Sequence, residues 1–430
     1  MNDRDRLLAS PAARAGIALA LLLFVVVAVM GHVAHGDRML ETLRHGSDPL
    51  GYYQYLPALL GTHTMEALPW SHQLGPDRWL NLFTIGVALM QAPFFLGGAL
   101  FAWASGQPVD GYSLPFAHAR ILAAAFYLAA GSLLLFHALR ARWGMVVAWA
   151  TPVVILLTTN LWHYAVHESG MSHVYSFFLF AWLLFLTVRM VAQPRADRLV
   201  GLIACTTLIV LVRPLNGIAL LLPLCYGAPL PKALLERWRW VREFPGAVLG
   251  GLAIAAVPLA LQSAYWLHVT GEPILFTYGK KGEGFDWLHP HLWDVLFSHQ
   301  GGWFIYTPVM LPVMAVMVRG AWRRIPGHLP VLIIWACAWY VYSSWWIWWL
   351  GGAFGHRGFV EHYAFLSLGF AGLLAMLPHW KKWARVPALS ILAFLAFVNI
   401  RMSALYASPW DGEAWTWDSL FAVWEQVFRW

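Results

Sequence analysis

The stretch that decides the fold is residues 15–33, AGIALALLLFVVVAVMGHV, which carries no Asp, Glu, Lys or Arg. A helix of about 20 apolar residues crosses a bilayer, because it rises roughly 1.5 Å per residue across a ~30 Å hydrocarbon core. Arg4, Arg6 and Arg14 precede this stretch. It is long for the apolar region of a signal peptide, and no small-x-small cleavage pattern follows it. We therefore expect a retained membrane anchor that starts in the cytoplasm.

The composition of the whole chain extends this expectation. Of the 430 residues, 60% are hydrophobic and only 11% are charged, whereas a soluble protein needs roughly a quarter of its residues charged. These proportions exclude soluble, disordered and collagen-like chains and predict a polytopic membrane protein. The formal charge of +7 fits basic loops that stay in the cytoplasm, so we set nucleic acid aside. The three cysteines show no CxxC spacing, which indicates neither a disulfide framework nor a zinc–thiolate site.

About 11 apolar stretches are long enough to span the membrane. They are residues 15–33 and stretches near 118–139, 145–160, 172–189, 199–213, 216–229, 245–266, 303–318, 328–344, 364–378 and 386–403. Residues 80–104 are apolar as well, but we expect them to lie along the membrane surface, with a break at Pro93. Most Lys and Arg residues and few acids then fall on the cytoplasmic side, as the positive-inside rule requires.

The expected fold class is all-α, a polytopic transmembrane helical protein. Residues 1–403 form one transmembrane domain, and residues 404–430 form a short, Trp-rich interfacial tail. The first outer loop, about residues 34–116, carries interfacial helices near 50–60 and 80–103. We expect the protein in the cytoplasmic (inner) membrane, with its N-terminus in the cytoplasm and its distinctive polar residues on the outer side.

The sharpest local pattern is residues 47–57, SDPLGYYQYLP, which sets an acid and three tyrosines just past the first span. Two interpretations stay open. Asp48 followed by Pro49 suits the start of a helix, and tyrosines favour the headgroup level. Alternatively, Asp48 is a base or metal ligand at the membrane face, with Tyr52 one helical turn away. Asp37, the other acid near the end of the first span, is expected to be a solvated surface residue.

Two outer turns carry further candidate side chains. Glu168 lies between His167 and His173, a set that could ligate a metal; it lacks the HExxH pattern, so interfacial hydrogen bonding is the alternative. Arg213 interrupts an apolar region, where an arginine needs a partner, an anion or a route to water.

Two later segments could bind an anion. Lys280 lies in residues 278–285, YGKKGEGF, a glycine-rich loop that is not a Walker sequence; a flexible solvated loop is the alternative. Arg357 follows residues 345–356, WWIWWLGGAFGH. The tryptophans alone would form an aromatic belt, but the glycines bring Arg357 to the same outer surface as Asp48. Its planar donor fork matches phosphate oxygens.

In their order along the chain, these segments resemble the GT-C superfamily of integral-membrane glycosyltransferases, which take sugars from polyprenyl-phosphate carriers at the outer membrane face. The resemblance rests on Asp48 with Tyr52 and Tyr53 after the first span, on the long first outer loop and on the surface segment at residues 85–95. Residues 110–113, 171–173, 213–214, 296–298 and 351–357 resemble a bacterial, glycosyltransferase-like branch. The resemblance covers essentially the whole chain.

The resemblance implies that Asp48 is the catalytic residue. Many members carry two adjacent acids, whereas Pro49 follows Asp48 here, which favours a lone general base over a two-carboxylate metal site. The implied reaction is inverting transfer of a sugar from a polyprenyl-phosphate donor to a hydroxyl of a glycan, lipid or protein. We assign the remaining roles by residue type: donor-phosphate binding to Arg357, Arg213, Lys280 and His173, and the substrate pocket to Tyr52, Tyr53 and Glu168. The sequence requires no cofactor and gives no support for a divalent metal.

Two other function classes remain open. A transporter or flippase of a lipid-linked or small anionic substrate would use Arg213 and Arg357 as binding groups. Transporters carry ionisable residues deep in their spans and repeated halves; this chain shows neither, and its polar groups gather on one face, which favours an enzyme. The third alternative is a catalytically silent relative that acts as a scaffold.

Overall fold

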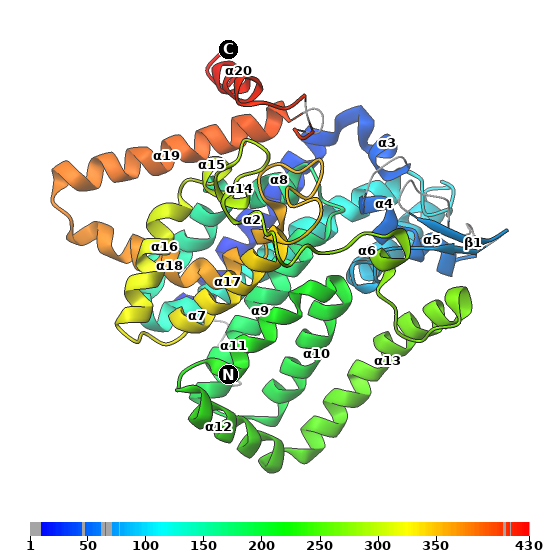
Figure 1. The fold of residues 1–430 in the computed structure, drawn as a ribbon, viewed down its shortest axis with the longest axis horizontal. Coiled ribbons are helices and arrows are strands. Elements are labelled where there is room, and N and C mark those ends of the chain that lie inside the picture. The colour runs from blue at the N-terminus through cyan, green and yellow to red at the C-terminus, as the bar shows by residue number, and fades with distance from the viewer. Residues whose placement is uncertain are drawn as a thin grey trace.

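The structure, a computed structural model, describes residues 10–44, 48–61, 65, 71–76, 78–406, 410–412 and 414–429, except for the side chains of Lys280 and Lys281. The chain is mostly helical (Figure 1). The first half contains α2 (Pro11–His35), η1 (Gly36–Arg38), α3 (Met39–Arg44), α4 (Asp48–Tyr53), α5 (Tyr55–Leu59), α6 (Gly86–Ala104), α7 (Leu114–Thr158), α8 (Leu161–Val166), α9 (Ser172–Ala192) and α10 (Ala196–Val212).

The second half continues the helical pattern. It contains η2 (Pro214–Leu220), α11 (Leu221–Cys225), α12 (Leu230–Glu243), α13 (Pro245–Thr270), η3 (Thr277–Lys281), α14 (Leu292–Phe297), α15 (Trp303–Tyr306), α16 (Met310–Trp322), α17 (His328–Ser343), η4 (Arg357–Phe359), α18 (Tyr363–Met376), η5 (Leu377–His379), α19 (Lys382–Leu405) and α20 (Trp417–Val427). The expected all-α fold lacks one feature of the structure, an antiparallel hairpin of β1 (His72–Gly75) and β2 (Arg78–Leu80) between α5 and α6.

Within the described ranges, 6 helical segments are long and apolar enough to cross a membrane. They are Pro11–Arg44, Gly86–Ala104, Leu114–Thr158, Ser172–Ala192, Pro245–Thr270 and Lys382–Leu405. A bent pair joins Pro214–Cys225 to Leu230–Glu243 at 92°, and Met310–Trp322, His328–Ser343 and Tyr363–His379 are shorter apolar helices. Each stretch expected to span carries helical backbone. The protein is therefore a helical membrane protein, and the number of its crossings stays a prediction.

Helix α7 is the central element of the bundle and contacts α2, α6, α9, α18 and α19. The sequence predicts two spans here, and α7 runs through both, with a non-helical break at Gly144, where φ is 78°. Glycine adopts this left-handed conformation without the steric cost that other residues meet. Small side chains of α7, among them Ala123, Ala124 and Ala125, are fully buried in the main apolar core.

The described residues between α2 and α7 form short elements around α6. Helices α4 and α5 occupy the region where the sequence predicts a helix near residues 50–60. Gly86, the first residue of α6, lies directly against the end of α10, since a Cβ there would be 2.2 Å from the carbonyl carbon of Leu211. Only glycine permits this approach, which sets the end of α10 and the following Arg213 beside the first outer loop.

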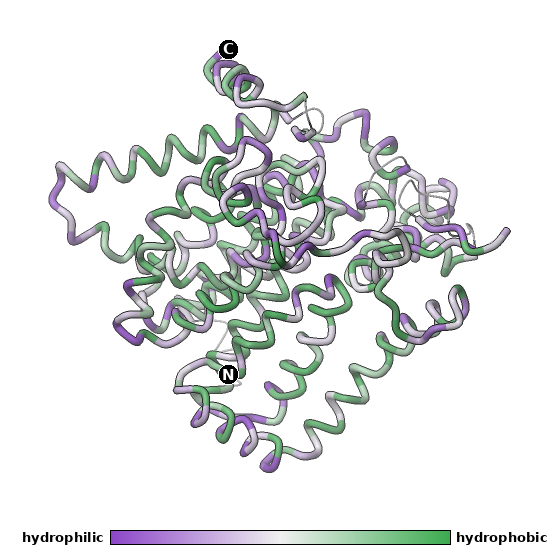
Figure 2. Tube along the Cα trace, viewed as in Figure 1, coloured by the Kyte–Doolittle hydropathy of each residue, from purple (hydrophilic) through white to green (hydrophobic). Residues whose placement is uncertain are grey.

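Hydropathy separates the chain into an apolar band with two polar borders (Figure 2). One border includes α12 and the connections between α16 and α17 and between α18 and α19. The opposite border contains the irregular segments that surround α4, α14 and α15. This distribution fits helices that lie in a bilayer with polar ends on either side.

The C-terminal segment packs back on the bundle. Helix α20 contacts α19, and its first turn is closed by a capping box between Thr416 and Ser419. Trp410, only 5% exposed, packs in a cluster with Tyr306 and Phe354. The Trp-rich tail is therefore attached to the same end of the molecule as the 345–357 segment.

The orientation of α6 decides the predicted topology, because α6 is itself long and apolar enough to cross. If α6 lies along the outer surface, a cysteine at Gln107, introduced with Cys225→Ser and Cys337→Ser, reacts with a membrane-impermeant maleimide on intact cells. Gln193→Cys, in the loop predicted to be cytoplasmic, is the matched control and should react only after the cells are opened. Protection of Gln107→Cys until lysis would show that α6 crosses the membrane.

Candidate functional site

A cavity of about 1000 Å³ opens where α4, the turn before α9, the end of α10 and the segment after α17 meet. Pockets of this size hold small organic ligands. Its polar wall contains Asp48, Tyr52, Glu168, Ser172, His173, Arg213, Tyr278, Glu283, Arg357 and Tyr406. Its apolar wall contains Trp266, Ile274, Leu275, Phe276, Phe285, Trp345, Trp346 and Ile347, among others. The cavity thus offers both charged groups and a wide apolar surface to a ligand.

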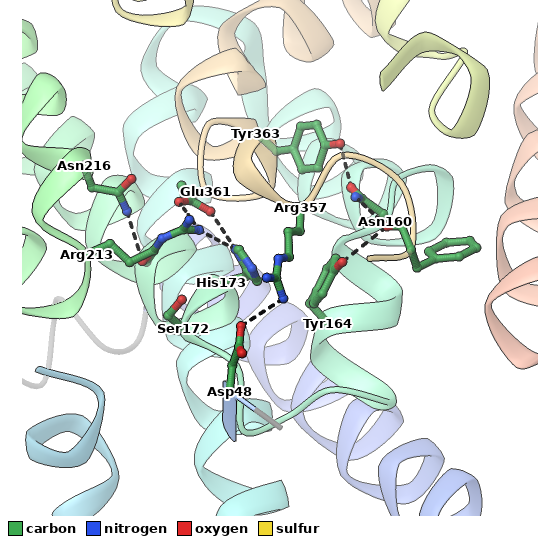
Figure 3. A network of polar contacts seen from close by, with 12 residues as sticks. Asp48, Asn160, Tyr164, Ser172, His173, Arg213, Asn216, Arg357, Glu361 and Tyr363 are labelled. Atoms are coloured by element: carbon green, nitrogen blue, oxygen red, sulfur yellow. Dashed lines mark hydrogen bonds and ion pairs between the residues drawn. The ribbon is translucent and has the colours of Figure 1, made fainter. Parts of the chain in front are cut away.

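An ion pair between Asp48 and Arg357 lies at this cavity (Figure 3). Arg357 Nη1 is 3.1 Å from Asp48 Oδ2, and the two side chains are 20% and 23% exposed. Asp48 is the first residue of α4. In the described part of the chain, its carboxylate bonds the guanidinium rather than an N–H of the first helical turn, so the ion pair replaces the capping role that the sequence left open. The partial exposure keeps both groups accessible to a ligand.

The segment before Arg357 turns sharply to deliver it. Gly351, Gly352 and Gly355 have φ values of 51°, 48° and 63°, which favour glycine. A Cβ on Gly355 would also meet Tyr306 Cβ at 3.0 Å. His356 is fully buried, and its Nε2 is 3.0 Å from the carbonyl oxygen of Trp348. The glycines and this bond fold the segment back toward α4.

Close contacts hold α4 against the turn before α9. A Cβ on Gly170 would lie 2.6 Å from Pro49 Cβ, so only glycine fits beside the residue that follows Asp48. The hydroxyl of Tyr52 donates to Ser172 Oγ at 3.2 Å. Asn81 Nδ2 donates to the carbonyl oxygen of Gly51 at 2.7 Å. Asp48 is therefore fixed from two sides.

A second ionic cluster joins Arg213, Glu361 and His173. Arg213 Nη1 is 3.1 Å from Glu361 Oε1, and His173 Nδ1 is 3.1 Å from Glu361 Oε2. Figure 3 shows Arg213 and Arg357 on either side of His173. Burial alone would raise the pKa of Glu361, but the Arg213 guanidinium and the His173 hydrogen bond outweigh it and lower this pKa to about 2. Glu361 is therefore ionised and holds Arg213 at the cavity wall.

Glu168 is a third carboxyl group at the cavity. Burial raises its pKa to about 7; Arg120 and Arg357 act in the opposite direction, and Asp48 adds to the increase. A carboxyl group with this pKa is protonated about half of the time at neutral pH. Glu168 can therefore donate a hydrogen bond where Asp48, beside a guanidinium, accepts one.

The structure brings together most of the predicted site residues, namely Asp48, Tyr52, Glu168, His173, Arg213 and Arg357. Tyr53 lies elsewhere: its hydroxyl donates to the carbonyl oxygen of Gly111, and its ring packs on Phe95 and Tyr112. Consecutive residues of a helix point about 100° apart, so Tyr52 and Tyr53 face different surroundings. Lys280 belongs to η3, but its side chain lies outside the described residues.

The remaining polar candidates lie away from the ion pairs. Asp37, in η1, is exposed, as expected of a solvated acid. His167 stacks on His163, with ring centroids 5.4 Å apart. Among the described residues, no three His, Cys, Asp or Glu side chains form a group that could hold a metal ion.

Glu361 and Tyr406 line or support the cavity but were not among the residues predicted from the sequence. Glu361 contacts Arg213 across 148 positions of sequence. The one available signal was a carboxylate in the otherwise apolar segment that follows Arg357, where a buried acid needs a cation. Tyr406 follows α19 and reaches the cavity only because the tail packs back on the bundle.

No family model, no curated protein and no solved structure matches this chain.

Replacing Glu361 by Gln should destabilise the protein, because it leaves the largely buried Arg213 without its counter-ion. Breaking a buried ion pair in this way costs about 3–5 kcal/mol. The measurement is the thermal unfolding midpoint in detergent. Asp197→Asn is the matched control, since it removes the partner of Arg195 in an exposed pair that is worth about 1 kcal/mol or less. Equal midpoints for the two variants would contradict the structural role of Glu361.

Glu168 and Glu361 should affect the free energy of unfolding in different pH ranges. Its folded-state pKa of about 7 exceeds the ordinary value of 4.5, so between these values the folded chain binds more protons than the unfolded chain. The contribution of Glu168 to the free energy of unfolding therefore falls as the pH rises through this window. The contribution of Glu361, whose pKa is lowered, is lost only as the pH falls below 4.5 toward about 2.

Glu168→Gln should remove this part of the pH dependence. We expect the thermal midpoint of the variant, relative to that of the wild type at the same pH, to rise as the pH rises from 4.5 to about 7. Glu425→Gln, at an exposed position of α20, is the control and should keep the slope of the wild type. A slope that is unchanged by Glu168→Gln would contradict a protonated Glu168.

Proposed function

We propose that the protein is a membrane glycosyltransferase that transfers a sugar from a polyprenyl-phosphate-linked donor to an acceptor hydroxyl, with inversion at the anomeric carbon. The observation that carries this proposal is the partly exposed ion pair of Asp48 and Arg357 at a large, mainly apolar cavity of a membrane protein. One partner can accept a proton and the other can bind a phosphate. The resemblance to the GT-C superfamily supplies the substrate class.

The proton of the acceptor goes to Asp48. Arg357 fixes the orientation of the carboxylate, so that its oxygens can accept a hydrogen bond from a hydroxyl in the cavity. As the acceptor oxygen forms its bond to the anomeric carbon, its proton moves to the carboxylate of Asp48. General-base catalysis of this kind accelerates a reaction about 10²–10⁴-fold.

The bond from the anomeric carbon to the lipid phosphate breaks in the same step, and the phosphate oxygen keeps the electron pair. A cation beside this oxygen stabilises the charge that develops on it. The contact with Asp48 engages one of the five N–H donors of Arg357, so this guanidinium can bond a phosphate without releasing Asp48. Arg213, held by Glu361, is the second cation of the cavity.

The lipid part of the donor requires an apolar route from the bilayer. Ile274 and Phe276 line the cavity and are 79% and 55% exposed. Both follow the end of α13, one of the helices that are long enough to cross the membrane. A polyprenyl chain can contact these side chains while its phosphate reaches Arg357.

Glu168 contributes through its protonated form. A neutral carboxyl group at the cavity can donate a hydrogen bond to a sugar oxygen, whereas a carboxylate only accepts one. The pKa of Glu168 is raised, whereas Asp48 is ion-paired with Arg357. The two carboxyl groups can therefore act as a hydrogen-bond donor and as an acceptor at the same pH.

The decisive variant is Asp48→Asn, which keeps the shape of the side chain but cannot accept the proton. We expect transfer from a radiolabelled polyprenyl-phosphate sugar, measured in membranes, to fall about 10²–10⁴-fold. Asp37→Asn, an exposed acid of the same outer loop, is the matched control and should keep its activity. Undiminished transfer by a well-inserted Asp48→Asn protein would falsify the mechanism.

A further inference from the structure

Helix α12 (Leu230–Glu243) is an amphipathic helix at the border of the bundle that lies away from the cavity (Figure 1). It turns by 92° from the apolar segment Pro214–Cys225 that precedes it. It ends at Glu243, and α13, which is long and apolar enough to cross the membrane, begins at Pro245. Because a single residue separates the two helices, α12 lies within a few ångströms of the membrane boundary.

One face of α12 is fixed to the protein. Arg237 Nε donates to the carbonyl oxygen of Pro223 at 2.8 Å, and its Nη2 donates to that of Tyr226 at 2.6 Å. The same guanidinium lies 4.3 Å from the ring centroid of Trp240. These contacts fix the orientation of α12 about its own axis. They thereby determine which of its side chains face outward.

The outward side combines an apolar stripe with a basic one. Leu230, Leu234, Trp238 and Val241 are exposed, and they fall within an arc of about 80° on a helix of 100° per residue. Three exposed cations, Arg242, Arg239 and Lys232, follow over a second arc of about 80° that begins about 40° beyond the first. The indole side chain of Trp238 is 59% exposed. Leaving this much apolar surface in water is unfavourable.

We propose that α12 lies in the plane of the membrane surface and binds anionic phospholipid headgroups through Lys232, Arg239 and Arg242. The apolar stripe then enters the region between headgroups and acyl chains, as in interfacial amphipathic helices. The cations extend their long side chains to the phosphates. This inference does not depend on the proposed enzymatic function.

The charge and the position of α12 favour a membrane surface, rather than the interior of the bilayer, as the surroundings of its outward side. A transmembrane placement would bury several charged groups in hydrocarbon, which is costly. The basic stripe complements the negative potential of the cytoplasmic leaflet, the side on which the excess of basic loops predicts α12 to lie. The short connection to α13 leaves the exposed stripe at the level where a bilayer begins.

The placement is tested with nitroxide labels on the full-length protein that carries Cys225→Ser and Cys337→Ser. Leu234→Cys reports on the apolar stripe and Glu243→Cys on the polar side. In phosphatidylcholine nanodiscs that contain phosphatidylglycerol, the label at residue 234 should be more accessible to oxygen and the label at residue 243 to a water-soluble nickel chelate. Access of the chelate to residue 234, or shielding of residue 234 from both reagents by a second protein copy, would overturn the proposal.

Headgroup recognition is tested at the same position with a fluorophore at residue 234 and phosphatidylglycerol that carries a quencher in its headgroup. Its local enrichment over labelled phosphatidylcholine should fall to that of the bulk bilayer when Lys232, Arg239 and Arg242 are together replaced by Gln. Replacing Arg319, Arg323 and Arg324 by Gln removes as many exposed charges outside α12 and should leave this enrichment unchanged. Equal enrichment in both triple variants would overturn the binding of anionic headgroups by α12.

Discussion

Charged groups at the end of an apolar helix bundle must be paired, and this constraint organises the site. Moving an isolated charge out of water costs several kcal/mol of solvation free energy. This cost is of the same order as the free energy of unfolding of a whole protein. Asp48 and Arg357 come from opposite ends of the chain and satisfy each other at the cavity. The short helix α4 and the glycine-rich segment before Arg357 are positioned relative to one another by this contact.

The two ion pairs at the cavity differ in exposure, and the difference suggests different roles. Glu361 is fully buried and bonds both Arg213 and His173, so that pair is part of the framework. Asp48 and Arg357 are each about one-fifth exposed, so both remain accessible to a ligand while they stay paired. A rigid pair beside an accessible one gives a site that keeps its shape while its reactive groups remain available.

The sequence predicted much of the architecture because apolar stretches are constrained by the thickness of a bilayer. It predicted Asp48 and Arg357 because ionisable residues beside such stretches are rare and informative. It did not predict Glu361, since the contact with Arg213 joins distant segments and leaves no local periodic signal. Tyr53 was placed in the pocket by its position next to Tyr52, although helical geometry separates neighbouring side chains. The hairpin of β1 and β2 is short and carries no clear alternation of apolar and polar residues.

The most direct measurement is a cryo-electron microscopy structure of the protein with a non-hydrolysable polyprenyl-phosphate sugar. We expect phosphate oxygens within hydrogen-bond distance, about 2.7–3.2 Å, of the Arg357 guanidinium. The anomeric carbon should lie in the same cavity, within reach of an acceptor hydroxyl held by Asp48. A phosphate bound outside this cavity, with Asp48 and Arg357 still paired and distant from the sugar, would contradict the proposed chemistry.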